Sequence, residues 1–388
     1  MKRVLVLGLA RSGRAAAAAL RRRGVEVVEA DRKLGNDADA ALLDGVDVVV
    51  KSPGVPRENA IVAAARVPVW SEVELGYRLL GRPLLGVTGT NGKTTTSELL
   101  GRMLGAPVAG NVGRALTELD GEAGEGVVVV ELSSFQLEGI ETFRPRVAVL
   151  LNLEPDHLDR HGSFDAYRVA KLRIFENQGE DDVAIVPRGH GSVPGMGTRL
   201  EFAWDDPLPA EPLLRGAHNR ENAVAATLAA LAAGASEEQI VEALRTFPGV
   251  AHRLELVGEV DAVAFVNDSK ATNVAAARRA LAAYADMPVY LILGGSLKGE
   301  DFTPLADAIG PNVRRAFLVG EAAEELARVI RVPFEHSGDL ESAVRAAAAA
   351  AVPGDVVLLS PACASYDQFR DFEHRGEEFT RLVRSLEA

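Results

Sequence analysis

The sequence has only one cysteine, and its first apolar run is too short to cross a membrane. Without a second cysteine no disulfide can form within the chain, which is typical of proteins in a reducing compartment. Cys363 itself is expected to be a small buried side chain rather than a nucleophile. The opening residues, MKRVLVLGLARSG, continue into a helix-like segment without a cleavage site. We therefore expect a cytoplasmic protein with no membrane partner.

Basic residues are in deficit, with 42 Lys and Arg against 55 Asp and Glu and a net charge of −13. Non-specific binding to nucleic acid needs a concentrated basic surface, so we expect no nucleic-acid partner, and any nucleotide would be held at a local site. A chain of 388 residues is too long for one ordinary core. The sequence therefore indicates two or three domains.

Short apolar runs alternate with Ala- and Leu-rich stretches at helical spacing, which is typical of βα units around mostly parallel sheets. Turn residues near Gly81 and the pair Pro248 and Gly249 divide this pattern. We predict an α/β protein of three domains: a Rossmann-like domain at 1–81, a P-loop ATPase-like domain at 82–249 and a Rossmann-like domain at 250–388. Strands are predicted at RVLVLG, VEVVEA, DVVVK, LLGVT, GVVVVEL, VAVLLNL, VAIVP, AVAFVND, PVYLILGG, AFLVG and DVVLLS.

The strongest motif is a glycine-rich loop that follows the strand LLGVT and opens a helix through SELLGRML. Its residues are Gly89, Thr90, Asn91, Gly92, Lys93, Thr94 and Thr95. Glycines let backbone N–H groups close on phosphate oxygens, while Lys93 would neutralise the β- and γ-phosphates and Thr94 would ligate magnesium. Val87 stands where the strict motif has its first glycine. A helix-capping turn with an unrelated lysine is the competing interpretation.

Two further polar clusters follow predicted strands. Glu131 ends the apolar strand GVVVVEL, and a carboxylate at the carboxyl end of a parallel strand faces the crevice where phosphates and magnesium bind. His157 comes shortly after VAVLLNL, with Lys171 downstream in a helical stretch. A lone histidine is usually structural, a lone lysine is usually a solvated charge, and Glu131 alone could be a solvated strand end. Only their combination indicates a metal site.

The first section contains a glycine turn from Gly8 to Gly13 after its first strand, with Asp31 after the second. Ala10 replaces the second glycine of the dinucleotide fingerprint, whose lack of a side chain admits the pyrophosphate, so we do not expect a nicotinamide cofactor. Another nucleotide or sugar nucleotide could occupy the same crevice. That possibility keeps Arg32 and the Ser52–Gly54 segment as candidate contacts.

Loops after the strands of the third section occupy similar positions. The segment Asn267–Asn273 ends one strand, Lys298 follows the next, and the loop Ser360–Phe369 follows the last. The small residues of this last loop would let backbone amides meet an anion. The alternative is a tight strand-to-helix turn.

Taken in order, the segments GTNGKTT, ELSSFQLE, EPDHLD with YRVAKLR, and GAHNRENAVAA ahead of AHRLE and NDSKATN resemble the Mur ligase family, the ATP-dependent amino-acid ligases of peptidoglycan assembly. The resemblance covers essentially the whole chain. The segment SPACASYDQFRDFEHRGEEF resembles the signature of the D-glutamate-adding members. This resemblance implies an ADP-forming ligase that joins D-glutamate to UDP-N-acetylmuramoyl-L-alanine through an acyl phosphate, in cell-wall synthesis and thus in cell shape and division.

The resemblance also implies roles for individual residues, transferred position by position. The expected ATP contacts are Gly89, Thr90, Asn91, Gly92, Lys93, Thr94, Thr95, Asn222, Arg253 and Asp268. The expected contacts to the UDP-muramoyl substrate are Arg11, Ser12, Asp31, Arg32, Ser52, Gly54, Asn111, Ser133 and Gln136. The expected D-glutamate pocket consists of Thr272, Lys298, Ser365 and Phe372.

For catalysis, the resemblance implies Lys93, Glu131, His157 and Lys171. Thr94 and Glu131 would hold a first Mg²⁺, and His157 and Lys171 a second, with Mn²⁺ as an alternative. Lys171 would carry CO2 as a carbamate, because an anionic oxygen ligand suits magnesium where an ammonium would repel it. We expect a monomer whose last domain closes on the middle one.

Three other functions compete with this interpretation. A different amino-acid ligase of the same family would keep the ATP motifs and change the loops of the third section. A nucleotide-dependent dehydrogenase would use the first glycine turn, although Ala10 opposes it. A non-catalytic P-loop module would bind ATP without needing Glu131, His157 and Lys171 together.

Overall fold

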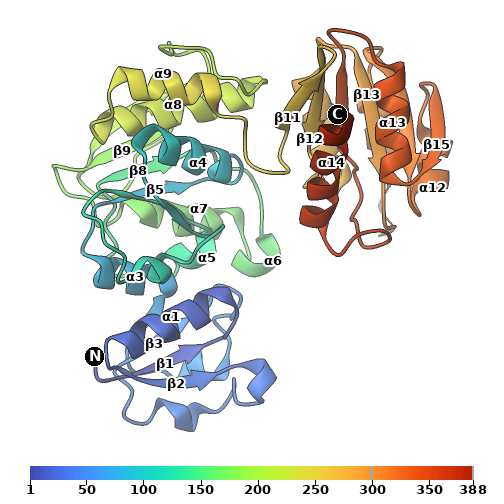
Figure 1. Ribbon diagram of the computed structural model, residues 1–388. Coiled ribbons are helices and arrows are strands. Elements are labelled where there is room, and N and C mark those ends of the chain that lie inside the picture. The colour runs from blue at the N-terminus through green and yellow to red at the C-terminus, as the bar shows by residue number, and fades with distance from the viewer. Residues whose placement is uncertain (298, 300, 387–388) are drawn as a thin grey trace. The chain divides into compact units, whose positions relative to one another are not determined.

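The computed structural model describes residues 1–297, 299 and 301–386, and three β-sheets carry its fold (Figure 1). The chain forms two compact units: Met1–Glu211 with Glu221–Arg245, and Pro212–Arg220 with the chain from Thr246 onward. The first unit contains two of the sheets and the second contains the third. The alternation of strands and helices confirms the predicted α/β class. No helix of the described residues is long and apolar enough to cross a membrane.

The first sheet has four parallel strands in the order β2-β1-β3-β4. Its strands are β1 (Arg3–Leu7), β2 (Glu26–Ala30), β3 (Val48–Lys51) and β4 (Val69–Ser71), and its helices are α1 (Arg11–Arg22), α2 (Ala60–Ala64) and α3 (Glu72–Leu80). Alternate residues of β1 point to opposite faces. Val4 and Val6 pack with α1 and α3, whereas Leu5 and Leu7 pack with Ile61 of α2. Burial on both faces explains why this strand reads as a continuous apolar run.

The second sheet has six parallel strands in the order β10-β9-β8-β5-β7-β6. They are β5 (Leu84–Thr88), β6 (Val108–Gly110), β7 (Val128–Glu131), β8 (Val147–Leu150), β9 (Val183–Pro187) and β10 (Thr198–Phe202). The chain leaves β5 for β6 and β7 on one side and later returns to β8 on the other. The order therefore reverses beside β5, and such a switch point opens a crevice at the carboxyl ends of the strands.

Helices cover both faces of this second sheet (Figure 1). They are α4 (Lys93–Leu104), α5 (Ser134–Leu137), α6 (Leu158–His161), α7 (Phe164–Leu172), α8 (Ala217–Ala232) and α9 (Glu237–Thr246). Buried leucines of α5 and α7 join one core with the strands, while α4, α8 and α9 lie over the other face. The loops after β5, β7 and β8 lie at the carboxyl ends of three adjacent strands, the position where a site can form.

Two buried glutamates of α3 fasten the first section to the second. Glu74 accepts hydrogen bonds from three successive backbone N–H groups, those of Glu141, Thr142 and Phe143, at 2.9 to 3.1 Å. Glu72 accepts from the backbone N–H and the hydroxyl of Thr117 at 2.6 and 2.7 Å. These contacts explain why the two sheets belong to one compact unit.

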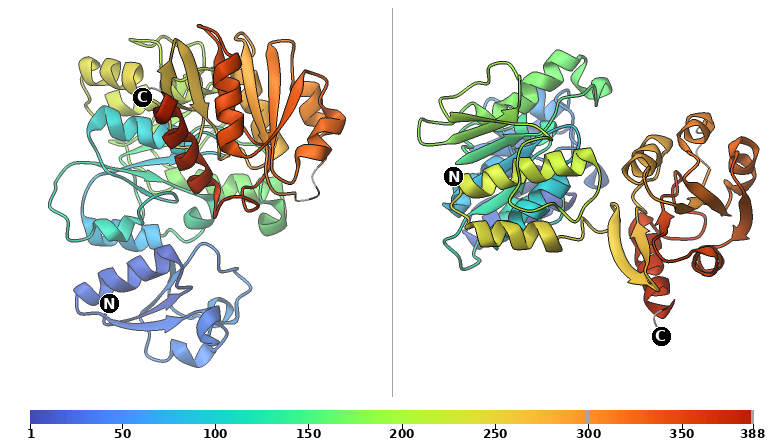
Figure 2. Two further views of the ribbon diagram at one scale, coloured as in Figure 1. Left: turned by 45° about the vertical axis from the view of Figure 1, so that its right-hand side comes forward. Right: turned by 90° about the horizontal axis from the view of Figure 1, so that it is seen from above.

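The third sheet has the order β11-β12-β16-β13-β14-β15, with β11 antiparallel and the others parallel. Its strands are β11 (Glu255–Val260), β12 (Val263–Asn267), β13 (Val289–Gly294), β14 (Val313–Val319), β15 (Phe334–Gly338) and β16 (Val356–Leu359). Its helices are α10 (Val274–Ala283), α11 (Thr303–Ala308), α12 (Ala323–Val329), α13 (Leu340–Ala350) and α14 (Phe372–Leu386). Helices α13 and α14 cover one face, and α10, α11 and α12 cover the other (Figures 1 and 2).

The alanine tract of α13 illustrates how the local sequence sets an element. Asp339 caps the helix by accepting a hydrogen bond from the backbone N–H of Ser342 at 2.8 Å. Alanine has the highest helix propensity, and the leucine and alanine side chains on one side are buried against the sheet. The predicted helix in SAVRAAAAAAV is confirmed.

Five strands were not predicted: β4, β6, β10, β11 and β15. Each of them is the outermost strand of its sheet. An outer strand has one hydrogen-bonded neighbour and more exposed side chains, so it lacks the continuous apolar run of an interior parallel strand. The unpredicted strands therefore extend the sheets without changing their class.

Candidate active site at the strand ends of the central sheet

The predicted phosphate loop connects β5 to the N-terminus of α4, as the sequence indicated. Gly92 immediately precedes the helix with a φ of 80°. A Cβ at this position would lie 2.3 Å from Oδ1 of Asn222 on α8. Only glycine fits this backbone conformation and this close approach. The structure thus brings Asn222, an expected ATP contact, against the loop.

Lys93 lies over the loop that it follows. Its Nζ donates hydrogen bonds to the carbonyl oxygens of Gly89 and Thr90, both at 2.9 Å. Backbone N–H groups and the positive end of the α4 dipole point to the same region. The ammonium is therefore held beside the position that a bound phosphate would take.

Hydrogen bonds connect the phosphate loop to Asn152, in the segment that follows β8. The backbone N–H groups of Thr90 and Asn91 donate to the carbonyl and to Oδ1 of Asn152 at 3.1 and 2.8 Å. The hydroxyl of Thr90 also lies 3.0 Å from the hydroxyl of Tyr167 on α7. These bonds fix the loop conformation before any nucleotide binds.

Glu131 lies at the end of β7 and is almost completely buried. Its Oε1 accepts a hydrogen bond from Nδ2 of Asn111 at 2.9 Å, and the carbonyl of Asn111 accepts one from Nη2 of Arg11 at 3.0 Å. Thr94, in the first turn of α4, is also buried. The structure thus joins two expected substrate contacts, Arg11 and Asn111, to an expected metal ligand.

Lys171 is the most unusual side chain of this region, because it is 2% exposed and lies on α7. Its Nζ donates to the carbonyl of Gly89 at 2.8 Å and lies 3.4 Å from Oγ1 of Thr88. Burial, with a smaller contribution from the positive charge of Lys93, lowers the pKa of Lys171 to about 7. A large fraction of this amine is consequently neutral, and hence nucleophilic, near neutral pH.

His157 precedes α6 in a left-handed conformation with a φ of 51°, and its side chain is half-exposed. Its ring centroid lies 6.4 Å from that of Tyr167, and Nζ of Lys171 lies 4.9 Å from the same Tyr167 centroid. Both expected ligands of the second metal therefore lie near the ring of Tyr167, which also contacts Thr90. Tyr167 was not predicted as a site residue, although it lies in the segment YRVAKLR.

Several expected substrate contacts of the first section have structural partners of their own. The carboxylate of Asp31 accepts from the backbone N–H groups of Leu9 and Lys33 at 2.5 and 2.8 Å, and the Leu9 bond in particular lowers its pKa. Ser52 is buried and donates its hydroxyl to the carbonyl of Gly8 at 2.6 Å. These bonds shape the crevice at the strand ends. Ser12 lies in the first turn of α1, Arg32 begins a 3-10 helix over Arg32–Leu34, and Gly54 lies in the turn after β3.

Ser133 and Gln136 form a capping box at the start of α5. The backbone N–H of Gln136 donates to Oγ of Ser133 at 3.3 Å, and the backbone N–H of Ser133 donates to Oε1 of Gln136 at 3.0 Å. Oγ of Ser133 and Oε1 of Gln136 thus form hydrogen bonds that stabilise the start of the helix. Any substrate contact would be made by their remaining hydrogen-bonding groups.

The remaining expected contacts that the structure describes lie in the second unit, near the carboxyl ends of the adjacent strands β12 and β16. Arg253 is exposed, Asp268 and Ser365 are buried, and Thr272 and Phe372 are partly buried. Lys298, the remaining predicted D-glutamate contact, lies outside the described residues.

A buried arginine, which was not predicted as a site residue, connects the carboxyl ends of β12, β16 and β13. The guanidinium of Arg375 on α14 donates to the carbonyls of Ser269, Cys363 and Ala364 at 2.8, 3.0 and 3.2 Å. Its Nη1 also lies 3.5 Å from the carbonyl of Gly294. Arg375 thus holds the loops of all three strands in one arrangement. Its only signal in the sequence was its place in the segment EHRGEEF.

Asp268 gives a testable prediction for this unit. It accepts a hydrogen bond from the hydroxyl of Ser360 at 2.8 Å, and burial raises its pKa to about 7. Between its ordinary pKa and about 7 the folded state binds more protons than the unfolded state. Raising the pH from about 4 to about 7 should therefore lower the free energy of unfolding by on the order of 3 kcal/mol.

The contribution of Asp268 should disappear in Asp268→Asn, which cannot ionise, whereas that of Glu72, whose pKa burial also raises to about 7, should remain. Thermal unfolding across this pH range tests the expectation. Asp286→Asn is the matched control, because Asp286 is a largely exposed aspartate of the same unit. Equal slopes for the wild-type protein and Asp268→Asn would show that Asp268 titrates normally.

Two parts of the chain match known protein families. The Mur ligase middle domain matches residues 87–194, and the Mur ligase glutamate ligase domain matches residues 252–363. Two solved structures from Thermotoga maritima share the fold. The first is a UDP-N-acetylmuramate-alanine ligase, with a TM-score of 0.58 and 20% sequence identity, and the match covers 99% of each chain. The second is a MurF ligase in complex with ADP, with a TM-score of 0.61 and 17% identity, and the match covers 98% of this chain and 95% of that one.

The chain belongs to the Mur ligase family, as its motifs predicted. A curated relative from Anaeromyxobacter dehalogenans, named UDP-N-acetylmuramoylalanine--D-glutamate ligase, is 45% identical over 98% of this chain and 97% of the relative. A relative of the same name from Geobacillus kaustophilus is 40% identical over 99% and 98%. The first alignment covers 452 positions, more than the 388 residues of this chain, so that relative has residues without a counterpart here.

Proposed function

We propose that this protein is an ATP-dependent ligase that adds D-glutamate to UDP-N-acetylmuramoyl-L-alanine as a cytoplasmic monomer. Similarity over the whole chain to relatives named for this reaction carries the proposal. The local geometry supports ATP chemistry, because a phosphate loop, a buried glutamate and a buried low-pKa lysine meet at the switch point of one sheet. A binding module would not need this combination.

In the first step, an oxygen of the substrate carboxylate attacks the γ-phosphorus of ATP. The bond from this phosphorus to its bridging oxygen breaks, and ADP leaves with the electron pair, so an acyl phosphate forms. Two anions must approach each other, and the ammonium of Lys93 would exchange its carbonyl partners for phosphate oxygens to reduce their repulsion. The N–H groups of the loop would hold the remaining phosphate charge.

The donor set fits magnesium once Lys171 is modified. No three His, Cys, Asp or Glu side chains gather as a metal site within the described residues, and an ammonium would repel a divalent cation. The neutral amine of Lys171 can attack CO2, forming an N–C bond and losing one proton to become an anionic carbamate. Thr94 with Glu131, and His157 with this carbamate, would then hold two magnesium ions, which supply positive charge to the phosphate oxygens.

In the second step, the amine nitrogen of D-glutamate attacks the acyl carbon of the acyl phosphate. The tetrahedral species releases inorganic phosphate, the nitrogen loses a proton, and an amide remains. We assign D-glutamate to the loops that Arg375 connects, with Thr272, Lys298, Ser365 and Phe372 as its contacts. Asn222, Arg253 and Asp268 would complete the nucleotide contacts.

Phosphate release tests this proposal directly. The protein is supplied with ATP, magnesium and UDP-N-acetylmuramoyl-L-alanine, and D-glutamate, L-glutamate, L-alanine, L-lysine or diaminopimelate is added separately. We expect release, and formation of the amide, with D-glutamate alone. Turnover with another amino acid would support a ligase of the same family and would reject D-glutamate as its substrate. An absence of substrate-dependent turnover would reject the ligase.

A further inference from the structure

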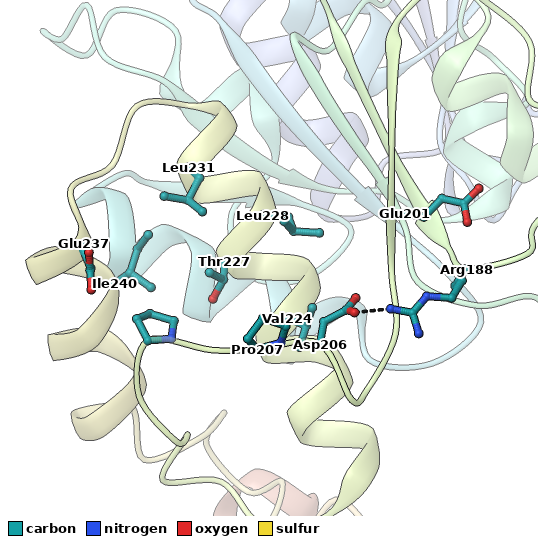
Figure 3. Close-up of a pocket in the computed structure, with 11 residues that line it drawn as sticks. Arg188, Glu201, Asp206, Pro207, Val224, Thr227, Leu228, Leu231, Glu237 and Ile240 are labelled. Atoms are coloured by element: carbon teal, nitrogen blue, oxygen red, sulfur yellow. Dashed lines mark hydrogen bonds and ion pairs between the residues drawn. The ribbon is translucent and has the colours of Figure 1, made fainter.

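A cavity of about 510 Å³ lies in the first unit, among residues that the ligase reaction does not use (Figure 3). It lies between α8, α9, the turn after β9, the strand β10 and the loop that follows β10. Its lining residues are Arg188, Glu201, Asp206, Pro207, Pro209, Val224, Thr227, Leu228, Leu231, Glu237 and Ile240. Its volume lies in the usual range for small-molecule pockets.

The wall on α8 is an apolar stripe with one polar group. Val224, Thr227, Leu228 and Leu231 repeat at helical spacing along one face, and Ile240 of α9 faces them (Figure 3). Thr227 is 5% exposed, and its Oγ1 has no hydrogen-bond partner within the part of the chain that the structure describes. An unpaired buried hydroxyl is costly, so a ligand that offers it a hydrogen bond would gain affinity.

The rim of the cavity is acidic. Glu201, Asp206 and Glu237 line it together with one basic residue, Arg188. Arg188 already forms ion pairs with Asp205 and Asp206, and Arg199 forms one with Glu201 at 3.0 Å. Among the three lining carboxylates, Glu237 is the one that has no ion pair within the described residues. The net negative charge of this rim favours a cationic ligand over an anionic one.

The cavity is separate from the phosphate loop, although α8 contributes to both. Asn222 approaches Gly92, whereas Thr227 lines the cavity five residues later. Five residues turn a helix by about 500°, so the two side chains point about 140° apart. The helix thus presents one face to the nucleotide loop and another to the cavity.

We propose that this cavity is a second small-molecule site, which binds an amine with a compact apolar body and a hydroxyl group. The apolar body packs against Leu228, Leu231 and Ile240, the hydroxyl pairs with Oγ1 of Thr227, and the ammonium meets the acidic rim. This site does not depend on the ligase reaction.

Isothermal titration of the full-length protein with tyramine tests the site. We expect saturable binding with a Kd of about 1 mM or tighter. Phenethylamine, which lacks the hydroxyl, should bind several-fold more weakly, and phloretic acid, which carries a carboxylate in place of the amine, at least about ten-fold more weakly. No saturable binding of tyramine, or equal binding of phloretic acid, would overturn the proposal.

Two variants assign the binding to this cavity. Leu231→Trp should fill the cavity and abolish tyramine binding, and because Leu231 is 52% exposed the change should not disturb folding. Thr227→Val keeps the shape and should remove the preference for tyramine over phenethylamine. ATP binding should be unchanged in both variants and in saturating tyramine. Tyramine binding that survives Leu231→Trp, or that competes with ATP, would place the ligand elsewhere and contradict the proposal.

Discussion

Replacing Lys171 with alanine should reduce amide formation by about 10³-fold or more, because on the proposed mechanism the carbamate of Lys171 would hold one of the magnesium ions that neutralise the phosphate charge. Nζ of Lys171 lies 2.8 Å from the carbonyl of Gly89, so its modified form would lie against the phosphate loop. Formate or acetate should partly restore the rate in Lys171→Ala by placing a carboxylate in the vacated space. Phosphate release with and without these anions measures the effect.

The matched control is Arg168→Ala on the same helix, where the side chain is exposed and pairs only with a neighbouring surface aspartate among its described contacts. It should leave the rate unchanged. Since only the neutral amine reacts with CO2, wild-type activity at a fixed, limiting CO2 concentration should fall as the pH decreases below about 7, and a higher CO2 concentration should restore it. Full activity of Lys171→Ala would exclude the carbamate.

The second large effect is expected for Lys93→Met, which preserves side-chain length and removes the charge. The rate of acyl phosphate formation should decrease by about 10³-fold, because the positive charge acts mainly on the phosphoryl group in transit. ATP binding should weaken much less, since the loop N–H groups and the bonds between Asn91 and Asn152 remain. Single-turnover kinetics and equilibrium ATP binding separate the two quantities.

Arg102→Ala is the control for this variant, because Arg102 is an exposed residue in the last turn of the same helix. It should retain both binding and rate. If Lys93→Met lost ATP affinity and rate in equal proportion, the lysine would contribute to nucleotide binding alone.

The interior of each sheet could be predicted from the sequence, whereas its edges could not. Strands β5, β7 and β8 are buried on both faces and read as unbroken apolar runs. Strand β10, TRLEF, has one buried residue, and β4 and β6 have three residues each. A strand with solvent on one side needs no apolar run, so its pairing depends on the neighbour that is already in place.

The main residues of the candidate site could be predicted from their positions at strand ends. The contacts that hold these residues in place could not. Glu131 and the phosphate loop lie where the βα pattern predicts, because parallel strands direct their carboxyl ends to one edge. Tyr167 and Arg375 were missed because their role depends on contacts between segments distant in sequence, such as Tyr167 with Thr90. A pattern of residue types carries no information about such pairings before the fold is known.

The arrangement around Arg375 has a consequence for protein engineering. One guanidinium binds the backbone carbonyls of loops that belong to β12 and β16 and reaches that of β13. Since these bonds go to the main chain, they tolerate many side chains but require each loop to keep its path. On the proposed assignment of D-glutamate to these loops, amino-acid preference should therefore be easier to redesign by exchanging side chains within them than by transplanting a loop of different length from a relative.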